Sequence, residues 1–159
     1  MKNKVRWLVI VMSVIILSGC MSLTTTQRKA YDDDQYILQE KDNYTFTNRS
    51  YQDEDENYAM TFDTFYGVET LWEMDAEAEG KLFLEYESNL KKGSFRCVLV
   101  TPENEVITLF DGTDKGKLEL DVVEGKSWLK IVGKDAGGAF AITINKAENI
   151  RIETVKQMK

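Results

Sequence analysis

The chain of 159 residues contains no histidine, one proline and only two cysteines. Histidine is the commonest general base and the commonest metal ligand, so its absence excludes Ser-His-Asp and Cys-His nucleophile systems and His-ligated zinc. Two cysteines are too few for an all-thiolate zinc site or an iron–sulfur cluster within one chain. We therefore expect no bound cofactor and no enzymatic activity.

Positive charge is scarce as well. The sequence has 20 Lys+Arg against 27 Asp+Glu, a formal net charge of -7 at pH 7. Because proteins hold phosphate backbones through clustered lysines and arginines, this balance excludes nucleic acid as a partner. The length suits one ordinary domain.

No apolar run is long enough to cross a bilayer. The longest, from Trp7 to Leu17, would reach only about half of a ~30 Å hydrocarbon core at ~1.5 Å per helical residue. Three basic residues precede it, at positions 2, 4 and 6. A basic start followed by a short apolar core is typical of a secretory signal peptide.

The apolar run ends in Leu17-Ser18-Gly19-Cys20, which resembles the lipobox of bacterial lipoproteins. The resemblance implies that residues 1–19 are a signal peptide and that Cys20 becomes the first mature residue. It also implies that a diacylglyceryl group on Cys20 attaches the protein to the membrane, which two acyl chains do stably. The alternative is an ordinary signal peptide or short anchor with an incidental cysteine. We expect an extracytoplasmic, lipid-anchored protein whose mature side chains carry a charge of -10.

Three segments follow the signal peptide. Residues 20–30 hold the lipidated cysteine and are polar without periodicity, which predicts a flexible tether. Residues 31–56 are rich in acids and tyrosines and predict partial order, with a short strand at 44–47. Residues 57–159 show short apolar alternations separated by turn residues and predict the folded domain.

The alternations predict the fold class. Runs of five to eight residues with period two, with turn signals every ~8–12 residues, are typical of all-β antiparallel folds. We expect a jelly-roll-like β-sandwich with few or no helices. The glycine-rich residues 133–138 are interpreted as a hairpin connection. The predicted strands are 69–76, 81–87, 94–100, 106–110, 117–123, 127–132, 139–144 and 150–155.

Two stretches resemble the bacterial pre-peptidase C-terminal domain. Residues 98–110, VLVTPENEVITLF, are similar to its strand–turn–strand hairpin, and residues 124–144, EGKSWLKIVGKDAGGAFAITI, are similar to its closing hairpin. The family's acidic run is replaced by Phe95-Arg96-Cys97. The whole chain also resembles small lipoproteins of Gram-positive bacteria. These resemblances imply a sandwich with a non-catalytic binding or accessory role and supply no active-site residues.

Clustered acids suggest a calcium site, since hard cations prefer carboxylate and carbonyl oxygens. Asp53, Asp55 and Asn57 match the first, third and fifth positions of an EF-hand loop, but Tyr58 stands where glycine is required. The motif fails, and a calcium site of another kind or a solvated acidic loop remains open.

Paired carboxylates could run glycoside hydrolysis without histidine. Glu73, Asp75, Glu85 and Glu87 would share one face if residues 69–76 and 81–87 formed a hairpin. Their alternation with apolar residues also fits the solvated side of a half-buried sheet.

The last candidates are two tryptophans and a thiol. Trp72 alternates with apolar residues, which favours the core, whereas Trp128 faces away from Leu129 and Ile131 and is the better candidate for stacking on a ligand. For both tryptophans, packing in the core or between sheets is the favoured alternative. Cys97 lies in an alternating apolar run and is expected to be buried. The sequence thus favours a cell-surface binding module for a protein or glycan. The alternatives are a structural or envelope-stress lipoprotein and a carboxylate-dependent glycan hydrolase.

Overall fold

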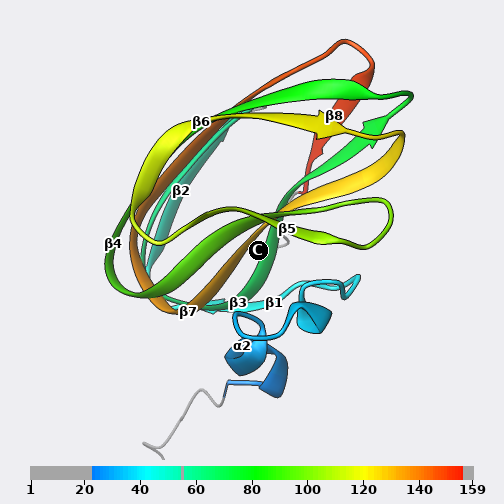
Figure 1. Ribbon diagram of the computed structural model, residues 1–159. Coiled ribbons are helices and arrows are strands. Elements are labelled where there is room, and N and C mark those ends of the chain that lie inside the picture. Colours follow the sequence, from blue (N-terminus) through cyan, green and yellow to red (C-terminus); the bar gives the residue numbers. More distant parts are fainter. Residues whose placement is uncertain (1–22, 55, 156–159) are drawn as a thin grey trace, which may run out of the picture.

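Three long antiparallel strands run through the whole molecule and curve strongly along their length (Figure 1). The computed structural model describes residues 23–54 and 56–155. Strand β7 lies between the other two and pairs with both along nearly its full length. The three strands are β3 (Asn57–Ala76), β4 (Gly80–Val100) and β7 (Gly125–Lys146).

Because all three long strands bend, one sheet folds over into two facing layers. Layer A has the strand order β2, β3, β7, β4, β6. The three long strands contribute residues 57–62 of β3, 138–146 of β7 and 80–90 of β4. In layer B, the later part of β3 pairs with β1 and β8, and the end of β4 pairs with β5. The architecture confirms the predicted antiparallel β-sandwich. The shorter strands are β1 (Asn43–Phe46), β2 (Arg49–Glu54), β5 (Val106–Asp111), β6 (Asp114–Val122) and β8 (Ile150–Thr154).

The core lies between the layers and is rich in aromatic rings. Phe140 of layer A lies 5.3 Å, centroid to centroid, from Phe95 of layer B, and Tyr58 lies 6.1 Å from Trp72. Trp72 is fully buried, as its alternation predicted. Such offset and edge contacts add stability beyond the apolar area that they bury.

The bends fall where the sequence predicted connections between strands. The hairpin connection expected at residues 133–138 is wrong, because β7 continues through it. Residues 91–93, expected to separate two strands, lie within β4. Gly133 permits the close approach, since a Cβ there would lie 2.2 Å from the Phe65 ring. Gly93 adopts a φ of +71°, which favours glycine. The stretch 124–144 is therefore one bent strand rather than a closing hairpin.

The N-terminal segment packs on the outer face of layer B (Figure 1). This segment, residues 24–42 and here called the cap, contains helix α2 (Thr25–Lys29) and the 3₁₀ turn η1 (Asp34–Tyr36). A capping box between Thr24 and Gln27 starts α2. Ala30 and Ile37 are fully buried against valines of layer B. The flexible tether predicted for residues 20–30 is therefore wrong from Thr24 onward, because apolar burial holds this stretch in place.

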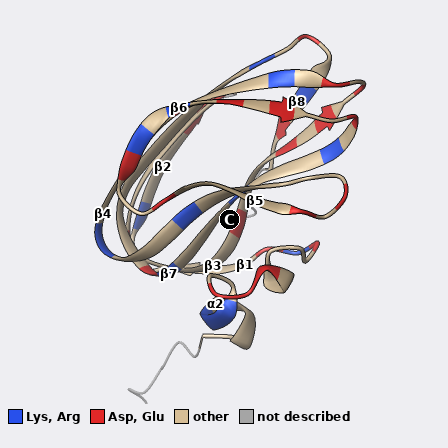
Figure 2. Cartoon of the chain, in the orientation of Figure 1, with Lys and Arg blue, Asp and Glu red and all other residues tan. Residues whose placement is uncertain are grey.

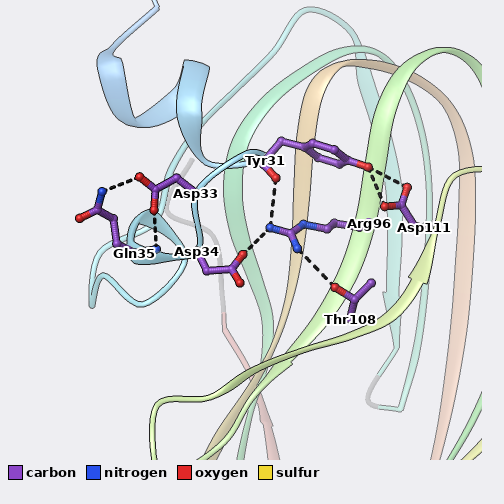
Figure 3. A network of polar contacts seen from close by, with 7 residues as sticks. All are labelled: Tyr31, Asp33, Asp34, Gln35, Arg96, Thr108 and Asp111. Atoms are coloured by element: carbon purple, nitrogen blue, oxygen red, sulfur yellow. Dashed lines mark hydrogen bonds and ion pairs between the residues drawn. The ribbon is translucent and has the colours of Figure 1, made fainter.

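Polar contacts fasten the cap to the sheet (Figure 3). The Arg96 guanidinium donates to the Tyr31 carbonyl at 3.1 Å and to Asp34 at 2.6 Å. The Tyr31 hydroxyl donates to both carboxylate oxygens of Asp111 at 2.7 Å. Burial, together with this carboxylate, raises the pKa of Tyr31 to about 12. Figure 2 shows an acidic stretch after α2, and Arg96 binds it at Asp34 (Figure 3). Lys134 binds Asp32 of the same stretch at 2.5 Å.

The predicted lipobox lies outside the described residues, so Leu17, Ser18, Gly19 and Cys20 have no structural account here. Among the residues that the structure does describe, none of the helices has the length and apolar character that crossing a bilayer requires.

Candidate functional site

A cavity of about 570 Å³ opens between the end of the cap and the outer face of layer B. Its walls come from distant parts of the chain, including the cap, three strands, the β4–β5 loop and the C-terminal stretch after β8. Such concave sites with an aromatic wall and a few polar groups are typical of ligand pockets. The lining residues are Leu38, Gln39, Glu40, Asp42, Thr70, Glu73, Val100, Asn104, Trp128, Lys130 and Val155.

Trp128 provides the aromatic wall of this cavity. It lies on the face of β7 opposite the buried Leu129 and Ile131, as the alternation predicted. Its side chain is half-buried, since one part packs against the apolar cluster under the cap. The sequence left core packing and ligand stacking as alternatives. In the structure the indole both packs against the apolar cluster and lines the cavity. Packing on one side fixes the ring while the other side lines the cavity.

Lys130 and Asp42 form the polar floor. The Lys130 ammonium, only 5% exposed, donates to the carbonyl oxygens of Ile37 at 3.0 Å and Gln39 at 3.2 Å. Burial lowers its pKa, although Asp42 at 3.9 Å acts in the opposite direction. Asp42 in turn accepts from the backbone N–H of Thr70 at 2.6 Å and from its hydroxyl at 2.8 Å. The floor is thus fixed by hydrogen bonds between cap and sheet.

The rim carries further hydrogen-bonding groups. Glu73 is paired with Lys126 at 2.5 Å, whereas the exposed Glu40 makes no side-chain hydrogen bond or ion pair in the described structure. Asn104 holds a left-handed backbone, with a φ of 63°, in the turn between β4 and β5. The cavity therefore combines an indole face with carboxylate, amide and ammonium groups. Such a set can bind a molecule that has both an apolar face and hydroxyl groups.

The predicted pair of carboxylate strands does not form. Strand β7 separates β3 from β4, so the two strands are not neighbours. Glu73 and Asp75 lie in layer B, whereas Glu85 and Glu87 lie in layer A. Asp75 is paired with Arg151 and Glu85 with Lys117, both at 2.9 Å. The hydrolase hypothesis thus loses the convergent carboxylates on which it rested.

The acidic calcium candidate lies at the turn between β2 and β3. Asp53 pairs across the hairpin with Tyr58, and the Asn57 side chain accepts a hydrogen bond from Thr143 at 2.8 Å. Asp55 lies outside the described residues. Within the described part of the chain, no group of three or more Asp, Glu or Cys side chains is placed to hold a metal ion.

Cys97 is fully buried in the core, as its alternation predicted. Burial raises the pKa of its thiol, which disfavours the reactive thiolate. We therefore assign it a packing role.

Comparisons with known proteins give only distant likenesses. No family model matches the chain, and no curated protein matches it. Nothing in the comparisons shows the pre-peptidase C-terminal domain or the lipoprotein family that the sequence resembles.

Solved structures align at low similarity. An exo-β-1,3-galactanase from Phanerochaete chrysosporium gives a TM-score of 0.39 at 10% identity, over 67% of this chain and 28% of its own. A family 35 carbohydrate-binding module from an environmental isolate gives 0.37 at 13% identity, over 70% and 83%. A family 4 module gives 0.35 at 5%, over 70% and 78%. At such scores the likenesses carry no argument about function, and the fold class rests on the strand pairing described above.

Sequence reasoning found one wall of the cavity and missed the others. The alternation of β7 placed Trp128 outward, and the same alternation places Lys130 beside it. The residues from 38 to 42 came from a segment predicted to be only partly ordered. Their position depends on contacts across about ninety residues of sequence, for which no local pattern exists.

Proposed function

We propose that this chain is a lipid-anchored, non-catalytic binding module outside the cytoplasm, and that the Trp128 cavity takes a glycan. The observation that carries the proposal is the cavity itself, in which an immobilised indole faces carboxylate, amide and ammonium groups. Sugars present C–H faces that pack on aromatic rings and hydroxyls that need hydrogen-bond partners. The candidate carboxylates are divided between the two layers, and Glu73, Asp75 and Glu85 are ion-paired, which supports a binding role over hydrolysis.

The anchor belongs to the proposal and rests on the sequence. A basic start, a short apolar core and Leu17-Ser18-Gly19-Cys20 together favour lipidation of Cys20. An acidic body with a mature side-chain charge of -10 is repelled by anionic lipid within about a Debye length. The lipid, rather than the polypeptide surface, would then hold the protein at the membrane.

Glycan binding is tested by screening the full chain on an oligosaccharide array and measuring each hit by calorimetry. We expect Trp128→Ala to weaken binding at least about tenfold, equal to ~1.4 kcal/mol, because the stacking surface is removed. Trp128→Phe should retain part of the affinity, since it keeps a ring and the packing under the cap. Phe83→Ala, which removes a 45% exposed ring outside the cavity, is the matched control.

Two outcomes contradict the proposal. The first is an array without a hit, which would favour a structural lipoprotein that has no dedicated ligand. The second is equal affinity in wild type and Trp128→Ala while circular dichroism shows both folded.

A further inference from the structure

The outer face of layer A has a floor of small side chains where a solvated sheet usually carries longer ones. Alternate residues of β3 and β7 point outward there, among them Ala59, Ala139 and Ala141. Ala59 pairs directly with Ala141, and Ala139 pairs with Thr61. Alanine is depleted in strands relative to β-branched and aromatic residues, on a scale that spans ~1 kcal/mol. Three alanines at the centre of this face therefore cost stability. Their short side chains leave open space above the sheet.

A hollow of about 450 Å³ occupies that space. Within its lining Glu87 is the one charged residue, so the hollow is close to neutral. Its walls stand on β2 and β4, on either side of the alanine floor. The lining residues are Ser50, Tyr51, Gln52, Ala59, Met60, Thr61, Glu87, Asn89, Ala139, Phe140 and Ala141.

The polar side chains that line the hollow are uncommitted. Ser50, Gln52, Thr61, Glu87 and Asn89 are exposed, and their side chains make no hydrogen bond or ion pair within the described structure. Together they offer hydroxyl, amide and carboxylate groups to a ligand. A ligand that supplied matching groups would gain hydrogen bonds without breaking any inside the protein.

Several of the neighbouring polar groups beyond the hollow are paired with one another, although Lys91 at one end and Lys115 at the other make no side-chain hydrogen bond or ion pair in the described structure. Asn48 donates to Asp63 at 2.6 Å at one end, and Lys117 binds Glu85 at 2.9 Å at the other. The central section is thus the part of this face where uncommitted hydroxyl, amide and carboxylate groups surround a floor of small side chains.

The hollow continues in both directions along β7. It shares Ala139 and Asn89 with one neighbouring depression, and Ala141 and Glu87 with another, each of about 590 Å³. Together they form a groove that follows β7 from Gly138 to Thr143. At ~3.3 Å per residue this is ~17 Å long. The groove is thus shaped for an extended chain rather than for a compact molecule.

We propose that this groove binds a stretch of an extended, uncharged polysaccharide, at a site separate from the Trp128 cavity. Methyl groups on the floor pack against the C–H faces of sugar rings, and the free wall groups bind their hydroxyls. In the central section an anionic polymer would meet Glu87 and no cation, while Lys91 and Lys115 stand only in the flanking depressions. An extended peptide adds to a sheet through the backbone of an edge strand, whereas this groove lies on the face.

The test fills the groove without weakening the sheet. Ala59→Ile/Ala141→Ile places two β-branched side chains on the floor, where strand propensity favours them, so the fold should persist. The matched control is Arg151→Ile/Glu153→Ile on β8 in layer B, where both side chains are well exposed. A third variant, Asn89→Ala, removes one wall group and leaves the floor intact.

The full chain and its variants are assayed by calorimetry against linear hexasaccharides of β-1,4-glucan, β-1,3-glucan and N-acetylglucosamine. A galacturonic acid hexamer and a serine- and glutamine-rich peptide of similar length serve as contrasts. We expect at least one neutral hexasaccharide to bind, and the double isoleucine variant to weaken it at least about tenfold. Asn89→Ala should weaken it by a smaller factor, and the control should leave it unchanged.

Three other outcomes would contradict the proposal that this groove binds a polysaccharide. These outcomes are no binding of any neutral hexasaccharide, equal binding by the filled variant, and equal or tighter binding of the anionic hexamer or the peptide. Binding that Trp128→Ala removes and the filled variant retains would assign the sugar to the cavity alone. In that case the proposed function stands and this inference fails.

Discussion

At the scale of single residues, Glu69 carries a carboxylate inside the core. Its side chain is fully buried on β3, and its one charged neighbour in contact is Arg49 at 2.7 Å. Neither carboxylate oxygen accepts a hydrogen bond of good geometry. Arg49 is itself held between the rings of Phe46 and Tyr51, each centroid 4.5 Å from the guanidinium carbon. Burial outweighs the arginine and raises the pKa of Glu69 to about 7.

This shift predicts a pH-dependent stability. The folded protein holds a proton at Glu69 that the unfolded chain releases near its ordinary pKa of 4.5. The stabilisation is complete below that value and is lost as pH rises through about 7, at up to ~1.4 kcal/mol per pH unit. We expect the free energy of unfolding, measured in urea, to fall between pH 5 and pH 8. Glu69→Gln should flatten this fall, while Glu119→Gln at an exposed position should not. The same slope in Glu69→Gln and wild type would refute the assignment.

At the scale of elements, the bends of the long strands determine which faces meet. Gly133 sits at such a bend, where the ring of Phe65 occupies the space of a side chain. Gly133→Ala should therefore cost about 1–3 kcal/mol, because the overpacked ring or strand must shift. Chemical denaturation measures the loss. Gly116→Ala is the control, because a Cβ added there would come no closer than 3.1 Å to another atom, the Tyr86 hydroxyl oxygen. Losses of equal size at the two glycines would show that the bend does not depend on Gly133.

The cap is the second element whose packing is testable. Ile37 is fully buried between cap and layer B, whereas the next residue, Leu38, is 38% exposed. Ile37→Ala should cost about 2–4 kcal/mol, as other buried truncations do. It should also shift tryptophan fluorescence to the red, because the cap covers part of Trp128. Leu38→Ala should cost much less. A cap that is only loosely attached would make both losses small and leave the fluorescence unchanged.

The strands were predictable to the extent that local patterns determine them. Period-two alternation placed residues 94–100, 106–110 and 117–122 in strands, although 94–100 continues β4 and β6 begins at Asp114. It also placed Cys97 inward and Trp128 outward. Continuity through residues 133–138 was not predictable, because glycines that permit a bend look the same in sequence as glycines that end a strand. The bend persists because β3 and β4 both pair with β7 on either side of it.

The candidate sites were less predictable than the strands, since each needs partners from distant segments. The cap had one local signal, the Thr24–Gln27 capping box, but a five-residue helix is stable only through packing. The groove floor depends on Ala59 facing Ala141, a strand pairing across about eighty residues. Alternation alone predicts on which face of the sheet each alanine lies, but not which residue of the adjacent strand it pairs with.

At the scale of the whole molecule, the two outer faces are in different situations. The cap lies on layer B (Figure 1), and a cavity stands at its margin. The outer face of layer A carries the groove and is open to solvent. The cap begins at Thr24, so four peptide links would join a lipid-bearing Cys20 to it. At ~3.3–3.6 Å per residue, such a link spans at most ~14 Å. The proposed anchor would thus hold the capped end of the sandwich close to the membrane, rather than on a long flexible tether.

The anchor itself gives the last prediction, for which the chain provides its own control. It has two cysteines, Cys20 in the predicted lipobox and Cys97 in the core. Cys20→Ala should abolish labelling by a palmitate analogue and move the protein from the membrane to the soluble fraction, because only lipid attaches it. Cys97→Ala should keep both label and membrane location, and lose only the small stability of a buried thiol. Label retained by Cys20→Ala, or membrane attachment without label, would contradict the anchor. The two proposed binding sites would then still be tested on their own.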